Sequence, residues 1–120
     1  MGLEVALIAL ALQGGDLFEI PRHFWGEYND RLANCGAEYD ESTLRISWDR
    51  VEFYASTGEL RGLIRNPDGS VVIIAEHQGE GEKWQSVYQL RMTPDRSQLV
   101  VVHPQALDVE QIQSSRLRCP

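Results

Sequence analysis

Apolar and polar residues alternate with a period of two along much of this chain, between Thr43 and Val102. In residues 43–48, for example, Leu44, Ile46 and Trp48 fall on one side, and the residues between them are polar. Successive side chains of a β-strand point to opposite faces. The alternation therefore predicts strands with one face turned toward a core.

Eight short segments carry this alternation or a run of strand-forming residues, and tight turns separate most of them. They are residues 24–28, 43–48, 51–55, 59–65, 70–78, 84–92, 99–102 and 114–119. Consecutive strands of this kind form an antiparallel meander, and a meander of this length removes its edges by closing on itself. The sequence predicts an all-β fold, a small antiparallel up-and-down β-barrel of about seven or eight strands with a short N-terminal helical segment. A β-sandwich is the alternative. In either fold we expect Trp48, Phe53 and Leu90 to point inward.

Three segments give more specific expectations. The β-branched run in residues 70–78 predicts a strand that is buried on both faces. In residues 59–65, Leu60 and Ile64 share a side, and Gly62 between them marks a bend or a close backbone approach. Pro21 predicts the first turn of a short helix.

The N-terminal region contains an apolar run, Val5 to Leu12, that is too short to span a bilayer. It fits the core of a secretory signal peptide, with a small-residue cleavage site at 9–11, although no basic residue precedes it. The alternative is a short N-terminal helix that ends at Gly14 and Gly15. We therefore divide the chain into residues 1–15, a signal peptide or helix, and residues 16–120, a single barrel domain.

Size, charge and cysteine content narrow the function classes. A chain of 120 residues forms one domain with one core, and its net charge of −7 argues against a nucleic-acid partner. The two cysteines, Cys35 and Cys119, are too far apart for a CxxC motif, so they form a disulfide or remain buried thiols. A disulfide would anchor the C-terminus and would require an oxidising compartment. We expect a periplasmic or secreted protein without a transmembrane segment.

The chain offers no strong catalytic or metal-binding motif. The acidic stretch 76–82 is either a cation-binding loop or a hairpin corner, and its spacing lacks the calcium-loop pattern, which favours the corner. The three histidines, His23, His77 and His103, do not provide three or four converging metal ligands. No serine lies in a GxSxG motif. We expect no metal, no cofactor and no enzymatic activity.

Aromatic residues are the remaining candidates for a binding site. In a barrel of this size they either fill the core or line a cavity that holds one small ligand. If the barrel has a rim, the candidate ligand-binding residues are Trp25, Tyr54, Glu80, Glu82 and Trp84.

Several sequence elements resemble a group of small exported bacterial proteins with a lipocalin-like, calycin-type barrel and no assigned function. These elements are "IPRHFWGEY", "NC" at 34–35, "LRISWDRVEFYASTGEL", "GEGEKW" followed by "YQLRMTPDRSQLVV", and the terminal "RCP". The resemblance implies an envelope domain with a Cys35–Cys119 disulfide, and it supplies no catalytic residues. A more distant similarity is to the periplasmic lysozyme inhibitors of small-barrel type, whose Ser-Gly inhibitory loop is not matched by "STG" at 56–58.

These observations predict a non-enzymatic barrel domain of the bacterial envelope that binds a small apolar ligand. The alternative is a protein-interaction or inhibitor module, similar to the lysozyme inhibitors, without a small-molecule ligand. A barrel interior above about 300 Å³ would favour the first function, and a filled interior would favour surface interactions.

Overall fold

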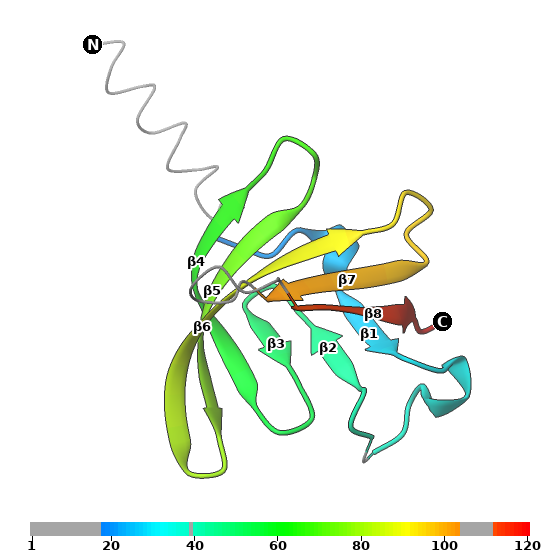
Figure 1. Ribbon diagram of the computed structural model, residues 1–120, viewed down its shortest axis with the longest axis horizontal. Helices are drawn as coiled ribbons and strands as arrows, with labels where there is room; N and C mark the ends of the chain where they lie inside the picture. The colour runs from blue at the N-terminus through cyan, green and yellow to red at the C-terminus, as the bar shows by residue number, and fades with distance from the viewer. Residues whose placement is uncertain (1–17, 39, 104–111) are drawn as a thin grey trace.

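The structure, a computed structural model, describes residues 18–38, 40–103 and 112–120, and its eight strands form one closed antiparallel barrel (Figure 1). Each strand pairs with the next, and the last pairs with the first. This confirms the predicted up-and-down barrel in place of a sandwich. The strands are β1 Gly26–Asn29, β2 Leu44–Ile46, β3 Arg50–Glu52, β4 Thr57–Arg65, β5 Val71–Gly79, β6 Glu82–Met92, β7 Gln98–His103 and β8 Ile112–Arg118.

The barrel closes at a short seam between β1 and β8. Only two residue pairs join these strands, Tyr28 with Arg118 and Asn29 with Leu117. The guanidinium of Arg118 donates to the carbonyls of His23 and Trp25, both at 2.9 Å, and so fastens the chain before β1 to the end of β8. The seam therefore depends on contacts outside its own ladder.

A disulfide between Cys35 and Cys119 reinforces this seam. It joins the loop after β1 to the residue that follows β8, and the Cys119 amide donates to the Glu27 carbonyl at 2.9 Å. The disulfide, rather than a pair of buried thiols, is the state that the structure shows. The predicted anchoring of the C-terminus is confirmed.

The core lies inside the barrel, and the predicted alternation decides which side chains enter it. On β5, buried residues alternate with half-buried ones, so the expectation that this strand is buried on both faces is wrong. The physical reason is that a closed antiparallel barrel has a single interior, and within the described residues no second layer covers the outside of β5. The core residues are Ile20, Phe24, Tyr28, Leu44, Ile46, Val51, Val71, Ile73, Ala75, Tyr88, Leu90, Leu99 and Val101.

A β-bulge corrects the expected faces of β4. Leu60 pairs with Ala75 but Gly62 pairs with Ile74, so Arg61 is an extra residue that reverses the alternation after it. Leu63 packs against the core, and Ile64 is 53% exposed. Ile64 therefore does not share the inner face with Leu60, although the irregularity predicted at Gly62 is present.

Trp48 is a second correction, because it is 51% exposed and not inward. Strand β2 ends at Ile46, so Trp48 lies in the turn before β3, where the strand alternation no longer applies. Leu90 is fully buried and Phe53 packs against the core, as expected for both.

Outside the strands, the described residues contain two 3₁₀ turns, Arg22–Phe24 and Leu32–Asn34, and no α-helix. Pro21 immediately precedes the first of them, so the short helix predicted at Pro21 is not present and a single 3₁₀ turn takes its place. The acidic stretch is a hairpin corner, since Glu80 and Gly81, with φ of 51° and 79°, form the two-residue turn between β5 and β6. The signal peptide or helix predicted in residues 1–15 lies outside the described residues. Within the described part of the chain, no helix is long and apolar enough to cross a membrane.

We predict that replacing both cysteines with serine will lower the stability of the barrel. The disulfide closes a loop between residues 84 positions apart, which corresponds to about 4–5 kcal/mol in the chain-entropy model. Urea unfolding of the double variant measures this loss, and wild-type protein with a thiol reductant is the matched control. An unchanged unfolding midpoint in both samples would contradict the role of the disulfide in the seam.

Candidate functional site

One end of the barrel carries an inward-facing group of aromatic and polar side chains, which we call the mouth cluster. It lies where β3 turns into β4 and β5 turns into β6, and five segments contribute to it. Its members are Phe53, Ser56, His77, Trp84, Tyr88, His103 and Arg116.

Phe53 occupies the centre of the mouth cluster. Its ring centroid lies 5.5 Å from that of His77, 5.8 Å from Tyr88 in an edge-to-face arrangement, and 6.5 Å from His103. The guanidinium carbon of Arg116 lies 5.9 Å from the same ring. Side chains from β5, β6, β7 and β8 thus converge on the residue that follows β3.

A short chain of hydrogen bonds satisfies the buried His77. Its Nδ1 lies 2.9 Å from Ser56 Oγ, and its Nε2 lies 3.3 Å from the Tyr88 hydroxyl. A neutral imidazole donates at one nitrogen and accepts at the other, so both contacts fit without a charge. A catalytic serine–histidine pair uses a carboxylate as its third group, whereas the third group here is a phenol.

Burial favours the neutral forms of the histidines and the tyrosine in the mouth cluster. It is the main cause of the lowered pKa of His77, and repulsion from a protonated His103 adds to it. The pKa of His103 is lowered by burial and then by the positive charge of Arg116. Burial also raises the pKa of Tyr88. At neutral pH, Arg116 is therefore the one charged member of the cluster.

Trp84 forms the exposed edge of the mouth cluster. The Trp84 ring stacks on the His77 ring, with centroids 5.7 Å apart and an interplanar angle of 15°. Trp84 is nevertheless 41% exposed to solvent. An aromatic face that is supported on one side and open to solvent elsewhere can pack against an apolar group.

The absence of a side chain at Gly58 makes room for His77. Gly58 is the cross-strand partner of His77, and a Cβ atom at Gly58 would lie 2.6 Å from Nε2 of the imidazole. Because His77 is only 3% exposed and is held by two hydrogen bonds, its ring has little freedom to move away.

Four of the five predicted ligand-binding residues lie at this end of the barrel. Tyr54 lies in the β3–β4 turn, and Glu80, Glu82 and Trp84 lie in or beside the β5–β6 corner. Trp25 lies at the opposite end, where its indole donates to the Ile20 carbonyl at 2.7 Å. Of the five, only Trp84 is a member of the mouth cluster, through its contact with His77.

Surface grooves of measurable volume lie outside the barrel. One of about 260 Å³ is lined mainly by apolar residues, including Phe18, Trp48 and Leu63. A second, of about 420 Å³, lies beside Trp84 and is lined otherwise by polar residues. Arg61, the bulge residue of β4, borders both grooves and forms ion pairs with Glu59 and Glu76.

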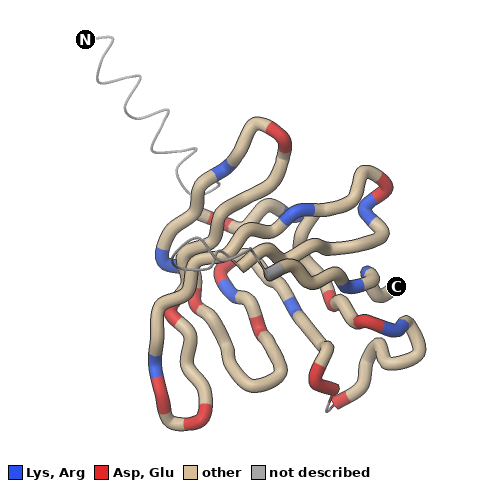
Figure 2. The backbone as a smooth tube through the Cα atoms, in the orientation of Figure 1, with Lys and Arg blue, Asp and Glu red and all other residues tan. Residues whose placement is uncertain are grey.

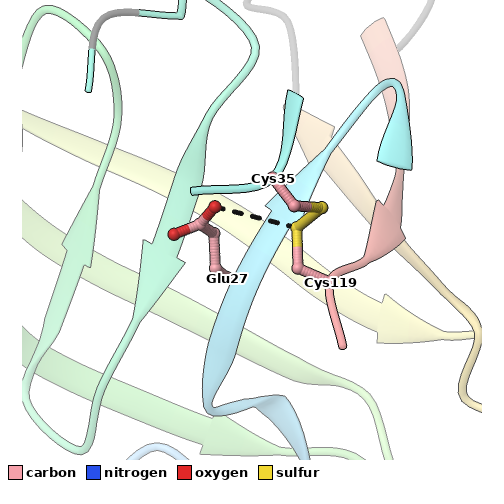
Figure 3. A group of neighbouring side chains, drawn as sticks. All are labelled: Glu27, Cys35 and Cys119. Carbon is pink, nitrogen blue, oxygen red and sulfur yellow. Dashed lines mark hydrogen bonds between the residues drawn. A yellow bond between two sulfur atoms is a disulfide. The ribbon is translucent and has the colours of Figure 1, made fainter. Parts of the chain in front are cut away.

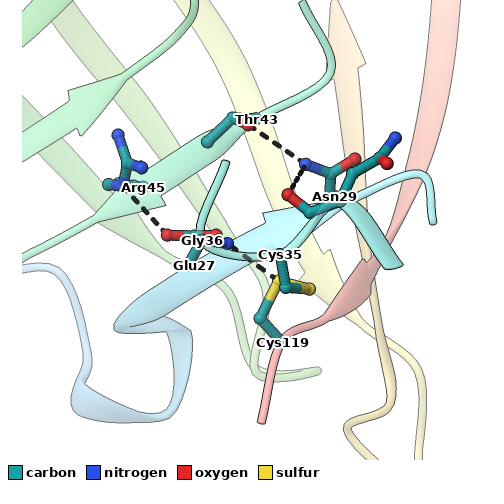
Figure 4. A network of polar contacts seen from close by, with 8 residues as sticks. Glu27, Asn29, Cys35, Gly36, Thr43, Arg45 and Cys119 are labelled. Carbon is teal, nitrogen blue, oxygen red and sulfur yellow. Dashed lines mark hydrogen bonds and ion pairs between the residues drawn. A yellow bond between two sulfur atoms is a disulfide. The ribbon is translucent and has the colours of Figure 1, made fainter. Parts of the chain in front are cut away.

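A separate polar group surrounds the disulfide. Glu27 accepts hydrogen bonds from the Gly36 amide and the Arg45 side chain, and it lies 3.8 Å from Cys119 Sγ (Figures 3 and 4). Glu27, Cys35 and Cys119 have the residue types of a metal site, but the two sulfurs are bonded to each other and cannot act as thiolate ligands. This group holds the loop after β1 in place.

Sequence reasoning did not identify His103 and Arg116 as parts of a site. Both residues face inward, because His103 continues the inner side of β7 and Arg116 pairs with the buried Leu99. The signal in the sequence was weak, since residues 104–119 lack a clear apolar alternation. Their convergence follows from the closure of the barrel.

Comparison with known proteins identified no matching family model, no matching curated protein and no matching solved structure.

We predict that Gly58→Ala will destabilise the protein by about 1–3 kcal/mol, the usual cost of overpacking. The added methyl group would collide with the His77 ring. In a His77→Ala background the same substitution should cost less, and urea unfolding of the four proteins measures this coupling. An equal cost in both backgrounds would show that the ring is not the obstacle.

We predict that stability will fall as the pH decreases from about 7.5 to about 5.5. The pKa values of His77 and His103 are lowered in the folded protein, so the unfolded chain binds more protons in this range and acid favours unfolding. Urea midpoints at the two pH values measure the effect. The His77→Gln/His103→Gln variant should show a flatter dependence, whereas an unchanged slope would assign it to other groups.

Proposed function

We propose that this protein is a non-enzymatic binding domain that holds a small, largely apolar ligand at the mouth of its barrel. The observation that carries this proposal is the mouth cluster itself. Ligand sites combine apolar and aromatic surface with a few converging polar groups. Phe53 and Trp84 supply the aromatic surface, and His103 and Arg116 supply the polar groups, all of them at least partly accessible.

The packed core sets the position of the ligand. Tyr28, Tyr88 and Leu90 fill the interior with exposures of 1% or less, and Phe53 lies across the mouth. A ligand would therefore contact the solvent-facing side of Phe53 and the Trp84 ring. The interior is filled, so the condition stated for a ligand inside the barrel is not met, and the observation favours interactions at the surface. The proposed site is accordingly a surface site at the mouth and not a deep, hollow barrel.

A protein-interaction module is the second candidate function, and the groove of about 260 Å³ favours it. Exposed Phe18 and Trp48 border this groove, and exposed aromatic residues are common at interfaces. The net charge of −7 suits a basic partner such as the lysozymes that small-barrel inhibitors bind.

An envelope location and membership of a lipocalin-like group are parts of the same proposal. The Cys35–Cys119 disulfide supports an oxidising compartment, such as the periplasm or the cell exterior. The closed antiparallel barrel supports the fold that the sequence elements indicated.

We predict that the neutral fluorophore N-phenyl-1-naphthylamine will bind saturably and will quench tryptophan emission. Trp84→Ala should weaken this binding by about tenfold, because it removes an aromatic contact and its apolar area. Fluorescence titration measures both affinities.

Trp48→Ala is the matched control, because Trp48 is also about half exposed but lies at the opposite end of the barrel. It should change the affinity by less than about twofold. Binding that depends on Trp48 and not on Trp84 would place the site in the outer groove. An absence of saturable binding would contradict the proposed function.

A further inference from the structure

Arg116 is an unusual residue for the interior face of a barrel strand. It pairs with Leu99 on the inner side of β8 and is half-buried. Burial of a charged group is costly unless the charge is compensated. None of the three ion pairs formed by the described residues includes Arg116. The negative charge of Asp30 stabilises the charged form of Arg116 without forming an ion pair with it.

The protein uses only part of the hydrogen-bonding capacity of Arg116. Its Nε donates to the Ser42 carbonyl at 2.8 Å, and its Nη1 donates to Ser114 Oγ at 3.2 Å. A guanidinium has five N–H donors, so these two contacts fix its orientation and leave donors on Nη1 and Nη2 for another partner.

The free donors are accessible. Among the described residues, every fully buried side-chain nitrogen and oxygen has a hydrogen-bond partner. Nη2 of Arg116 has no protein partner in that part of the chain, so it must contact solvent. A planar guanidinium that is oriented by the protein and retains donors without a protein partner matches the geometry of an oxyanion.

The surroundings of Arg116 link this polar edge to an apolar surface. The guanidinium lies 5.9 Å from the centre of the Phe53 ring, and His103 is the nearby titratable group, neutral at pH 7. A ligand at this position would contact a positive donor and an aromatic face together. That combination selects an amphipathic molecule over a purely apolar one.

We propose that Arg116 binds the anionic head group, a carboxylate or a phosphate, of a single-chain amphiphile whose apolar part lies against Phe53 and Trp84. This inference rests on the proposed function, because it names the class of ligand for the same site. It adds that charge, and not apolar area alone, determines which ligand is held.

The test compares three ligands with the same chain, dodecanoate, dodecyl phosphate and dodecan-1-ol. Each displaces N-phenyl-1-naphthylamine from the full-length protein, below the concentration at which it forms micelles. We expect at least one of the anions to bind about ten- to a hundredfold more tightly than the alcohol, the range for hydrogen bonds to a charged group. The two anions separate a carboxylate ligand from a phosphate ligand.

Three variants assign this preference to Arg116. Arg116→Gln should remove the preference and leave the affinity for dodecan-1-ol nearly unchanged. Arg116→Lys keeps the charge without the planar donor edge, so it should retain part of the preference. Arg91→Gln is the matched control, since Arg91 is exposed on β6 and its loss changes the net charge equally. Urea unfolding confirms that each variant is folded.

The outcomes distinguish the inference from the proposed function. Equal affinities of wild-type protein for the alcohol and both anions would overturn the inference and leave the proposed function standing. An anion preference that survives in Arg116→Gln, or that is lost equally in Arg91→Gln, would also overturn it. Failure of all three ligands and of the fluorophore to bind would overturn both.

Discussion

Closure of the barrel between β1 and β8 is the constraint on which the other features depend. The seam has only two residue pairs, so the disulfide and the contacts of Arg118 with the chain before β1 must supplement it. Closure also fixes the direction of the side chains on β8. With Leu117 paired to Asn29, the side chain of Arg116 must face the interior. A feature of overall topology thus places the charged member of the mouth cluster.

The interior combines an apolar core with a polar group of side chains. Fully buried apolar residues such as Leu44, Val51 and Leu99 belong to the core. Tyr88 joins the two, because its ring contacts Phe53 and its hydroxyl meets His77. The apolar core supplies the stability that permits the costly burial of polar groups. This combination also explains why the protein can have both a packed core and a candidate binding surface.

The sequence predicted the fold better than the site, and particular residues show why. The alternation of apolar and polar residues reflects local strand geometry. It therefore predicted the inward side chain of Leu90 and is consistent with the exposed Glu59 on β4 before the bulge. It failed at Ile64 and Trp48, because a bulge and a strand end each interrupt the period of two. The mouth cluster brings together Phe53 and Arg116, which are far apart in the chain. Their meeting depends on closure and register, which no local pattern encodes.

The distribution of charge bears on the selectivity proposed for the site. Acidic positions lie mainly along the loops and turns of the chain (Figure 2). Glu80 and Glu82, at the β5–β6 corner, are both exposed. These exposed charges keep the protein soluble and are screened over about 10 Å at moderate salt. The charge of Arg116 acts in a partly desolvated setting, where the effective dielectric constant is lower and screening is weaker. An anion would therefore be disfavoured over most of the surface and stabilised at one place, against the ring of Phe53. By the same argument, a net charge of −7 is compatible with the proposed binding of an anion at this one place.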